Sequence, residues 1–194
     1  EVDAAVAAAQ EAFPGWARLG PQGRGEILGR VADLVEARLE EFAQLETRDN
    51  GSLLRSHRRG VMPRVAMNIR FFAEYAVNDL KHPEFETRGH TNVVSWDPAG
   101  VAAIITPWNA PLMLATWRIG PALASGDTVV LKPPEWAPLT ASLFAEITAE
   151  AGMPPGVFNV VQGDAEAVDA LLTHPDIEAV SFVGSTGVAR HVYE

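Results

Sequence analysis

Apolar positions recur every three or four residues through the first 80 residues of the chain. This spacing places apolar side chains on one face of a helix and Arg and Glu on the other, and it predicts amphipathic helices that pack on a core. The predicted helices cover residues 1–13, 22–47 and 65–80. Pro14-Gly15 should end the first helix, and Asn50-Gly51 should close the second.

The third predicted helix carries three aromatic residues on one side, Phe71, Phe72 and Tyr75. Aromatic rings at helical spacing usually belong to a core. We therefore expect these rings to be buried.

Between residues 82 and 97 the pattern changes to short alternating apolar and polar residues. Residues 91–96 are the best candidate for a strand there, and the turn residues at 97–100 follow it. A strand at this point could leave the body of the domain as an arm.

After Gly100, four apolar runs alternate with segments of helical composition. The runs cover residues 101–106, 128–131, 157–161 and 179–183, and the helical segments cover residues 112–125, 139–151 and 165–173. Strands separated by helices are typical of βαβ units in a parallel sheet that is covered on both faces. The sequence therefore predicts an α/β fold: an incomplete, doubly wound (Rossmann-like) parallel sheet, preceded by N-terminal helices and a possible arm strand.

Unusual polar residues follow the first two predicted strands, at residues 106–109 and 132–135. In open parallel sheets, ligands bind outside the carboxyl ends of the strands. The amide of Asn109 could donate a hydrogen bond to a developing oxyanion, although an isolated loop Asn more often bonds its neighbouring backbone. Lys132 and Glu135 could bracket the two hydroxyls of a ribose, or form a surface ion pair worth at most about 1 kcal/mol.

The last predicted strand leads into Gly184-Ser185-Thr186-Gly187. A glycine-bearing turn from a strand into a helix can present free backbone N–H groups to an anion such as pyrophosphate. The G-x-G-x-x-G spacing of the usual dinucleotide fingerprint is missing, so the turn by itself is a weak signal.

Composition narrows the classes of partner. A chain of 194 residues with 47% hydrophobic residues is long enough for one globular domain. Its formal net charge of −10 argues against nucleic acid as the main partner. No run of about 18 apolar residues is present, so we expect no membrane partner and a cytoplasmic location. One basic cluster is expected to be an exposed helix end and turn: Arg55, His57, Arg58, Arg59 and Arg64.

The chain contains no cysteine, which excludes disulfides, thiolate metal ligands and a cysteine nucleophile within these residues. The five histidines are scattered without paired spacing, so we expect no metal site. No G-x-S-x-G motif is present, which disfavours a hydrolase.

Five motifs occur in order along the chain: Pro107-Trp108-Asn109, Gly120-Pro121-Ala122-Leu123-Ala124, Lys132-Pro133-Pro134-Glu135, Pro154-Pro155-Gly156-Val157-Phe158-Asn159 and Phe182-Val183-Gly184-Ser185-Thr186. Together they resemble the NAD(P)-dependent aldehyde dehydrogenase superfamily, and the resemblance extends from the first helix to the end of the chain. Residues 108–118 look most like bacterial semialdehyde dehydrogenases of aromatic-acid breakdown.

The resemblance implies roles for individual residues. Asn109 would be the side-chain half of an oxyanion hole, and Glu135 would repel a 2′-phosphate, which favours NAD over NADP. The implied cofactor-binding residues are Thr106, Pro107, Trp108, Lys132, Glu135, Gly163, Gly184 and Ser185. The implied substrate-tunnel residues are Ala110, Leu114 and Trp117. The implied partners are a small-molecule aldehyde and, through the arm, further copies of the chain in a homo-oligomer.

The family's catalytic cysteine and general-base glutamate lie beyond the Gly-Ser-Thr turn, outside these 194 residues. We therefore expect residues 1–194 to be the N-terminal part of a cofactor-binding domain. Its expected segments are a helical segment (1–81), an arm (82–97) and the first βα units of the sheet (101–194). The expected function is NAD-dependent aldehyde oxidation by a longer enzyme, of which this fragment alone is inactive. The alternative is a catalytically inactive dinucleotide-binding or assembly module.

Overall fold

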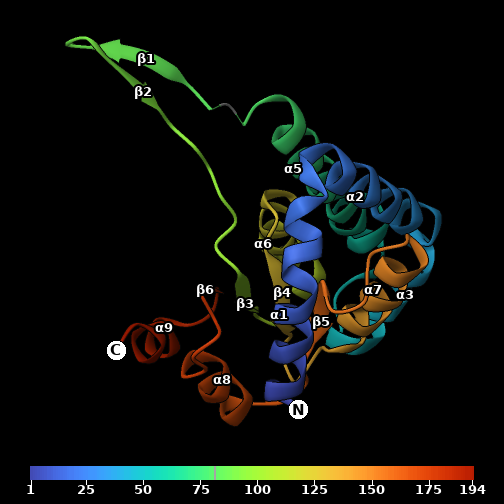
Figure 1. Ribbon diagram of the computed structural model, residues 1–194. Helices are drawn as coiled ribbons and strands as arrows, with labels where there is room; N and C mark the ends of the chain where they lie inside the picture. The colour runs from blue at the N-terminus through green and yellow to red at the C-terminus, as the bar shows by residue number, and fades with distance from the viewer. Residues whose placement is uncertain (81) are drawn as a thin grey trace.

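Four parallel strands in the order β5-β4-β3-β6 form the main sheet of the computed structural model, which describes residues 1–80 and 82–194 (Figure 1). Lys81, the last residue of the predicted helical segment, lies outside the described residues. The strands are β1 (Glu84–Thr87), β2 (His90–Val93), β3 (Val101–Ile105), β4 (Thr128–Lys132), β5 (Phe158–Val160) and β6 (Ala179–Phe182). The helices are α1 (Val2–Arg18), α2 (Gly20–Ala37), α3 (Leu39–Asn50), α4 (Leu54–Ser56), the π-helix η1 (His57–Val61), α5 (Met62–Asn78), α6 (Pro111–Ser125), α7 (Leu139–Glu150), α8 (Ala165–Leu172) and α9 (Thr186–Tyr193).

Strand β3 is the centre of this sheet. It pairs with β4 from Val101 opposite Thr128 to Ile105 opposite Lys132, and it pairs with β6 on its other side. The chain runs outward from β3 through β4 to β5 and then crosses to β6, so the strand order reverses between β3 and β6. This reversal is the topological switch point of a doubly wound sheet, which confirms the predicted fold class.

Both faces of β3 and β4 are buried, as an apolar strand with no polar alternation requires. On one face, Val6 and Ala9 of α1 pack on Val101, Ala103 and Val130, together with Leu171 of α8. On the other face, the apolar sides of α6 and α7 pack on the sheet, and α2, α3 and α5 cover them as a further layer. Figure 1 shows α1 running along the sheet, on the opposite side from α3 and α7.

The predicted end of the first helix at Pro14-Gly15 is wrong, because α1 continues through Pro14 to Arg18. The reason is packing: Trp16 is buried beyond the proline, and its Nε1 donates a hydrogen bond to the carbonyl of Leu123, 3.0 Å away. Burying an indole stabilises the protein by more than the one helical hydrogen bond that proline removes.

The single helix predicted over residues 22–47 is also wrong, because the chain breaks at Arg38 between α2 and α3. The apolar spacing continues across the break and therefore did not reveal the change of direction. Asn50-Gly51 ends α3 as predicted, with Gly51 in the left-handed conformation at φ 77°.

The expectation that all three aromatic rings of α5 are core residues is wrong for two of them. Phe71 is 57% exposed and Tyr75 is 45% exposed, whereas Phe72 packs against the core. The two exposed rings stack with their centroids 6.1 Å apart. Phe71 also lines a cavity with Trp117 and Arg118 of α6.

The predicted arm is a β-hairpin rather than one strand over residues 91–96. Strands β1 and β2 pair antiparallel around a two-residue turn, Arg88-Gly89, in which both residues have positive φ. Figure 1 shows the hairpin projecting away from the helices and the main sheet. Two-residue turns of this kind are usually Asn-Gly or Asp-Gly, so Arg88-Gly89 did not indicate a hairpin. Among the described residues, no helix has both the length and the apolar composition that crossing a membrane requires.

One buried arginine joins the ends of two helices. Arg24 of α2 donates from Nε to the carbonyl of Ala124 at 3.0 Å and from Nη1 to the carbonyl of Ala17 at 3.0 Å. Its Nη2 donates to the carbonyl of Ser125 at 3.3 Å. These carbonyls lie in the last turns of α1 and α6, where helices lack internal partners.

We predict that Arg24→Ala lowers the free energy of unfolding by about 3 kcal/mol, because it removes charged hydrogen bonds to partly buried carbonyls. Chemical denaturation of the complete protein that carries this chain measures the change. Arg59→Ala, which removes an exposed arginine of η1, should change the same quantity by less than about 0.5 kcal/mol. If both substitutions changed the free energy of unfolding equally, the hydrogen bonds of Arg24 would not be what stabilises the ends of α1 and α6.

Candidate functional site

A cavity of about 570 Å³ lies at the carboxyl ends of β3, β4 and β6, beside the switch point of the sheet. Open parallel sheets bind ligands at this position. Residues from three loops and two helices line it: Ile105, Thr106, Pro107, Trp108, Asn109, Leu114, Lys132, Pro134, Glu135, Trp136, Phe182, Val183, Gly184, Ser185 and Val188.

Most of the residues singled out in the sequence meet in this cavity. From the predicted set, the structure brings together Thr106, Pro107, Trp108, Asn109, Leu114, Lys132, Glu135, Gly184 and Ser185. Three others lie elsewhere. Trp117 lines a second cavity of about 460 Å³ with Phe71 and Arg118. Gly163 lines a third, of about 450 Å³, and Ala110 is the residue before α6.

Asn109 lies in the loop between β3 and α6, and its side chain is exposed. It makes no hydrogen bond to any described residue, so its amide group is free to donate into the cavity. Pro111 begins α6 two residues later, and its ring restricts the backbone there.

Lys132 is buried at the end of β4, and its Nζ lies 3.1 Å from Oε2 of Glu135. The pKa of Glu135 lies below its usual value, first because its own backbone N–H donates to the carboxylate and then because Lys132 does. Both residues line the cavity, and the Glu135 side chain is about half exposed. The cavity therefore presents the carboxylate of Glu135 next to the ammonium group of Lys132.

Three further residues complete this side of the cavity, Thr106, Trp108 and Trp136. The Thr106 hydroxyl is buried and has no hydrogen-bond partner among the described residues. Burying a polar group without a hydrogen-bond partner costs free energy. Such groups are therefore rare in native structures, and one that faces a cavity is a candidate for binding a ligand. Trp108 and Trp136 are both exposed, and their ring centroids lie 6.5 Å apart.

The turn after β6 begins α9 at the same edge of the sheet. Ser185 is the N-cap residue, and its Oγ accepts a hydrogen bond from the N–H of Val188 at 3.4 Å. A Cβ atom at position 184 would lie 2.4 Å from the end of the Phe182 ring, so a larger residue there would have to displace that ring. Gly184, Ser185 and Val188 line the cavity, so the N-terminal turn of α9 lies at its edge.

A buried pair that the sequence pattern did not reveal, Glu46 and His57, lies behind this site. Their exposed fractions are 0% and 2%, so the expectation that the basic cluster is wholly exposed is wrong for His57. Glu46 Oε1 lies 3.6 Å from His57 Nδ1, and neither atom has a hydrogen-bond partner among the described residues. Glu46 lies four residues after the buried Phe42, in the apolar stripe of α3, and that position was the available signal.

Burial determines the protonation of this pair. It raises the pKa of Glu46 to about 7, although hydrogen bonds from Thr140 and from the N–H of Leu112 favour the charged form. Burial lowers the pKa of His57. Asp49 also raises the pKa of Glu46, by repulsion between the two carboxylates.

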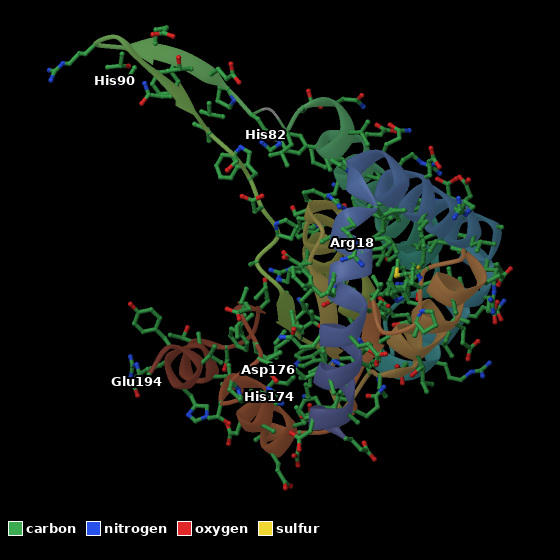
Figure 2. The ribbon with its side chains drawn as sticks, in the orientation of Figure 1. Arg18, His82, His90, His174, Asp176 and Glu194 are labelled. Atoms are coloured by element: carbon green, nitrogen blue, oxygen red, sulfur yellow. The ribbon has the colours of Figure 1, made fainter. Side chains whose placement is uncertain are left out.

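The other histidines lie apart from the cavity. Figure 2 shows His90 near the tip of the hairpin and His174 close to Asp176, whose N–H donates to His174 Nδ1 at 3.1 Å. Within residues 1–80 and 82–194, no three His, Asp or Glu side chains lie close enough together to hold a metal ion.

The whole chain, residues 1–194, matches the sequence model of the aldehyde dehydrogenase family. It is 47% identical over 198 residues to 2-aminomuconic semialdehyde dehydrogenase from Danio rerio, covering 100% of this chain and 40% of that protein. It is 43% identical over 195 residues to 5-carboxymethyl-2-hydroxymuconate semialdehyde dehydrogenase from Escherichia coli, covering 99% and 41%. Among solved structures, PnpE from Pseudomonas sp. WBC-3 in complex with nicotinamide adenine dinucleotide matches with a TM-score of 0.95 at 42% identity, covering 99% and 40%. The chain thus spans about 40% of the length of these relatives.

Glu46 should make stability depend on pH. Because folding raises its pKa from 4.5 to about 7, its contribution is fully present below about pH 4.5 and is lost as the pH rises through 7. The total loss is roughly 3 kcal/mol. Glu46→Gln cannot ionise, so its melting temperature relative to the wild type should increase from pH 5 to pH 8.

Thermal unfolding of the complete protein, followed by calorimetry at several pH values, measures this difference. The lowered pKa of His57 acts in the opposite direction, and both proteins retain it. A difference in melting temperature that stays constant from pH 5 to pH 8 would show that Glu46 does not titrate there.

Proposed function

The chain belongs to the aldehyde dehydrogenase family, and we propose that it supplies the cofactor-binding edge and one oxyanion donor of an NAD-dependent enzyme that oxidises an aldehyde to a carboxylic acid. The family match confirms the resemblance that the five ordered motifs carried. The observation that carries the proposal for this site is the meeting of Asn109, Lys132, Glu135 and Ser185 in one cavity at the switch point of the sheet.

The residues of the cavity fit a dinucleotide. Lys132 and Glu135 present a cation and a carboxylate that suit the hydroxyls of a ribose, and the Thr106 hydroxyl is a buried group in need of a partner. The N-terminal turn of α9, with Ser185 as its cap, suits a pyrophosphate. NAD, when bound, supplies the acceptor for a hydride. The NAD complex of PnpE supports the same cofactor here.

Asn109 would act on the substrate rather than on the cofactor. Its free amide can donate to an oxygen that gains negative charge, and a donor held in a low-dielectric cleft stabilises that charge strongly. This chain has no cysteine, and we propose that the family's cysteine nucleophile and glutamate base are supplied by residues outside these 194. On this proposal the active protein is a longer enzyme, and the present residues alone are inactive.

The proposed substrate is a small-molecule aldehyde or semialdehyde, since two close relatives carry semialdehyde dehydrogenase names. Leu114 would contact the substrate from the main cavity, and Trp117 would do so from the adjoining face of α6. Ala110, the residue before that helix, would also face the substrate. Gly163 would lie under the adenosine end of the cofactor, where φ of 147° requires glycine.

We also propose a cytoplasmic homo-oligomer in which the hairpin β1–β2 is an assembly arm. The residues of both strands are almost all exposed, and the hairpin has unpaired outer edges that another chain can pair with.

The competing function is a catalytically inactive dinucleotide-binding or assembly module. Both functions predict that NAD binds, so titration of NAD cannot distinguish them. If the protein is an aldehyde dehydrogenase, the complete protein should form NADH when it is incubated with NAD and an aldehyde. Binding of NAD without aldehyde-dependent NADH formation would favour the module.

We predict that Asn109→Ala in the complete enzyme lowers kcat by roughly 10²- to 10³-fold, the usual effect of removing one oxyanion donor. The dissociation constant for NAD should change little. Steady-state kinetics and NAD titration measure the two quantities. Asn78→Ala, at the exposed end of α5, is the control and should leave both unchanged. Equal loss of NAD affinity would assign Asn109 to the cofactor.

We predict that Glu135→Gln raises the affinity for NADP relative to NAD by about tenfold, because it removes a carboxylate that repels the 2′-phosphate. Competition between the two cofactors in a binding assay measures the ratio. Glu146→Gln removes an exposed carboxylate of α7 away from the cavity and should not change it. An unchanged ratio for Glu135→Gln would exclude a role for Glu135 in cofactor choice.

A further inference from the structure

The last turns of α3 contact the loops on both sides of the site, although α3 contributes no residue to the cavity lining. Oε2 of Glu46 accepts hydrogen bonds from the N–H of Leu112 at 3.4 Å and from the hydroxyl of Thr140 at 3.2 Å. Leu112 is in the first turn of α6, and Thr140 is in the first turn of α7. One buried oxygen atom therefore joins the helix that follows β3 to the helix that follows β4.

A second contact holds the chain on the other side of Asn109. The amide Nδ2 of Asn50 donates to the carbonyl of Trp108 at 3.4 Å. The orientation of this amide is fixed, because its Oδ1 accepts from both the N–H and the hydroxyl of Ser52. Asn109 thus lies between two anchored positions, one residue before it and three residues after it. We call Glu46 and Asn50 the α3 brace.

The brace can transmit its position to Asn109 because the intervening backbone is stiff. Pro111 fixes one backbone dihedral between Asn109 and Leu112, and the α6 helix follows immediately. The Asn109 side chain itself has no hydrogen bond to any described residue. Its location in the cavity is therefore determined by its backbone.

The burial of Glu46 is otherwise hard to account for. A fully buried carboxyl group costs free energy, and its second oxygen faces His57 without a hydrogen bond to any described residue. An apolar residue in this stripe of α3 would avoid that cost. What Glu46 adds is an acceptor for two donors in the first turns of two different helices, α6 and α7.

We propose that Glu46 is a positioning residue that places the Asn109 amide for oxyanion stabilisation by holding the first turn of α6 against that of α7. This inference rests on the proposed function of Asn109. It assigns Glu46 no contact with substrate or cofactor. Donors in an oxyanion hole act only when held at the right place, so a small displacement of the loop reduces the rate.

A double-mutant cycle in the complete enzyme tests the proposal. Glu46→Ala should lower kcat about 10- to 100-fold when Asn109 is present, and by less than about threefold in the Asn109→Ala background. In both backgrounds, Glu46→Ala should change the dissociation constant for NAD by less than about threefold. Glu46→Gln retains an oxygen acceptor for Leu112 and should restore most of kcat.

The matched control is Thr148→Ala. Thr148 is a buried polar residue of α7 whose hydroxyl donates to the carbonyl of Ala145 in its own helix, with no link to either loop. The Thr148→Ala substitution should lower the melting temperature without changing kcat. If Glu46→Ala does not yield folded enzyme, Asn50→Ala removes the second contact of the brace at a partly exposed site and should give the same pattern with a smaller effect.

Three results separate the possible failures. If Glu46→Ala lowers kcat equally in both backgrounds, Glu46 does not act through Asn109 and the positioning role is wrong. If Asn109→Ala does not lower kcat, the proposed function of Asn109 is wrong instead. In that second case, crystal structures still test the brace: the Asn109 loop should be displaced in Glu46→Ala and unchanged in Glu46→Gln. An undisplaced loop in Glu46→Ala would overturn the proposal.

Discussion

The structure depends on covering both faces of two apolar strands, β3 and β4, which carry no polar alternation and cannot face water on either side. Helices from distant parts of the chain supply the cover: α1 and α8 on one face, and α6 and α7 on the other. With both faces occupied, only the strand ends remain accessible. The polar residues that directly follow β3, β4 and β6 are thereby brought together at one edge.

Much of this arrangement could be predicted from residues 101–194, because each strand and helix there is local and is bounded by glycine or proline. The sequence-based predictions fail where contacts between distant parts of the chain determine the end of a helix or the burial of a side chain. Trp16 is buried against Leu123, and this packing extends α1 through Pro14. Phe71 and Tyr75 have the spacing of core residues, and nothing in that spacing indicates that no described helix covers them.

The same distinction holds for the site. Asn109, Lys132 and Glu135 could be found because they stand at strand ends, where topology alone determines location. Glu46 could not, since its importance comes from two donors 66 and 94 residues away in sequence. A carboxyl group whose pKa is raised by burial, and which nevertheless accepts two hydrogen bonds, is recognisable only once the surrounding backbone is in place.

The position of α1 has a consequence for the order of folding. Its contacts with the sheet join residues far apart, as in the hydrogen bond from the Thr128 hydroxyl to the carbonyl of Ala9, which spans 119 residues. Closing so long a loop costs more conformational entropy than forming a βαβ unit within residues 101–161. Helix α1 is synthesised before the strands that it covers, so its packing on the sheet must wait for β3 and β4. Helix α1 is therefore among the last of these elements to dock, and the part of the sheet that it covers stays open until it does.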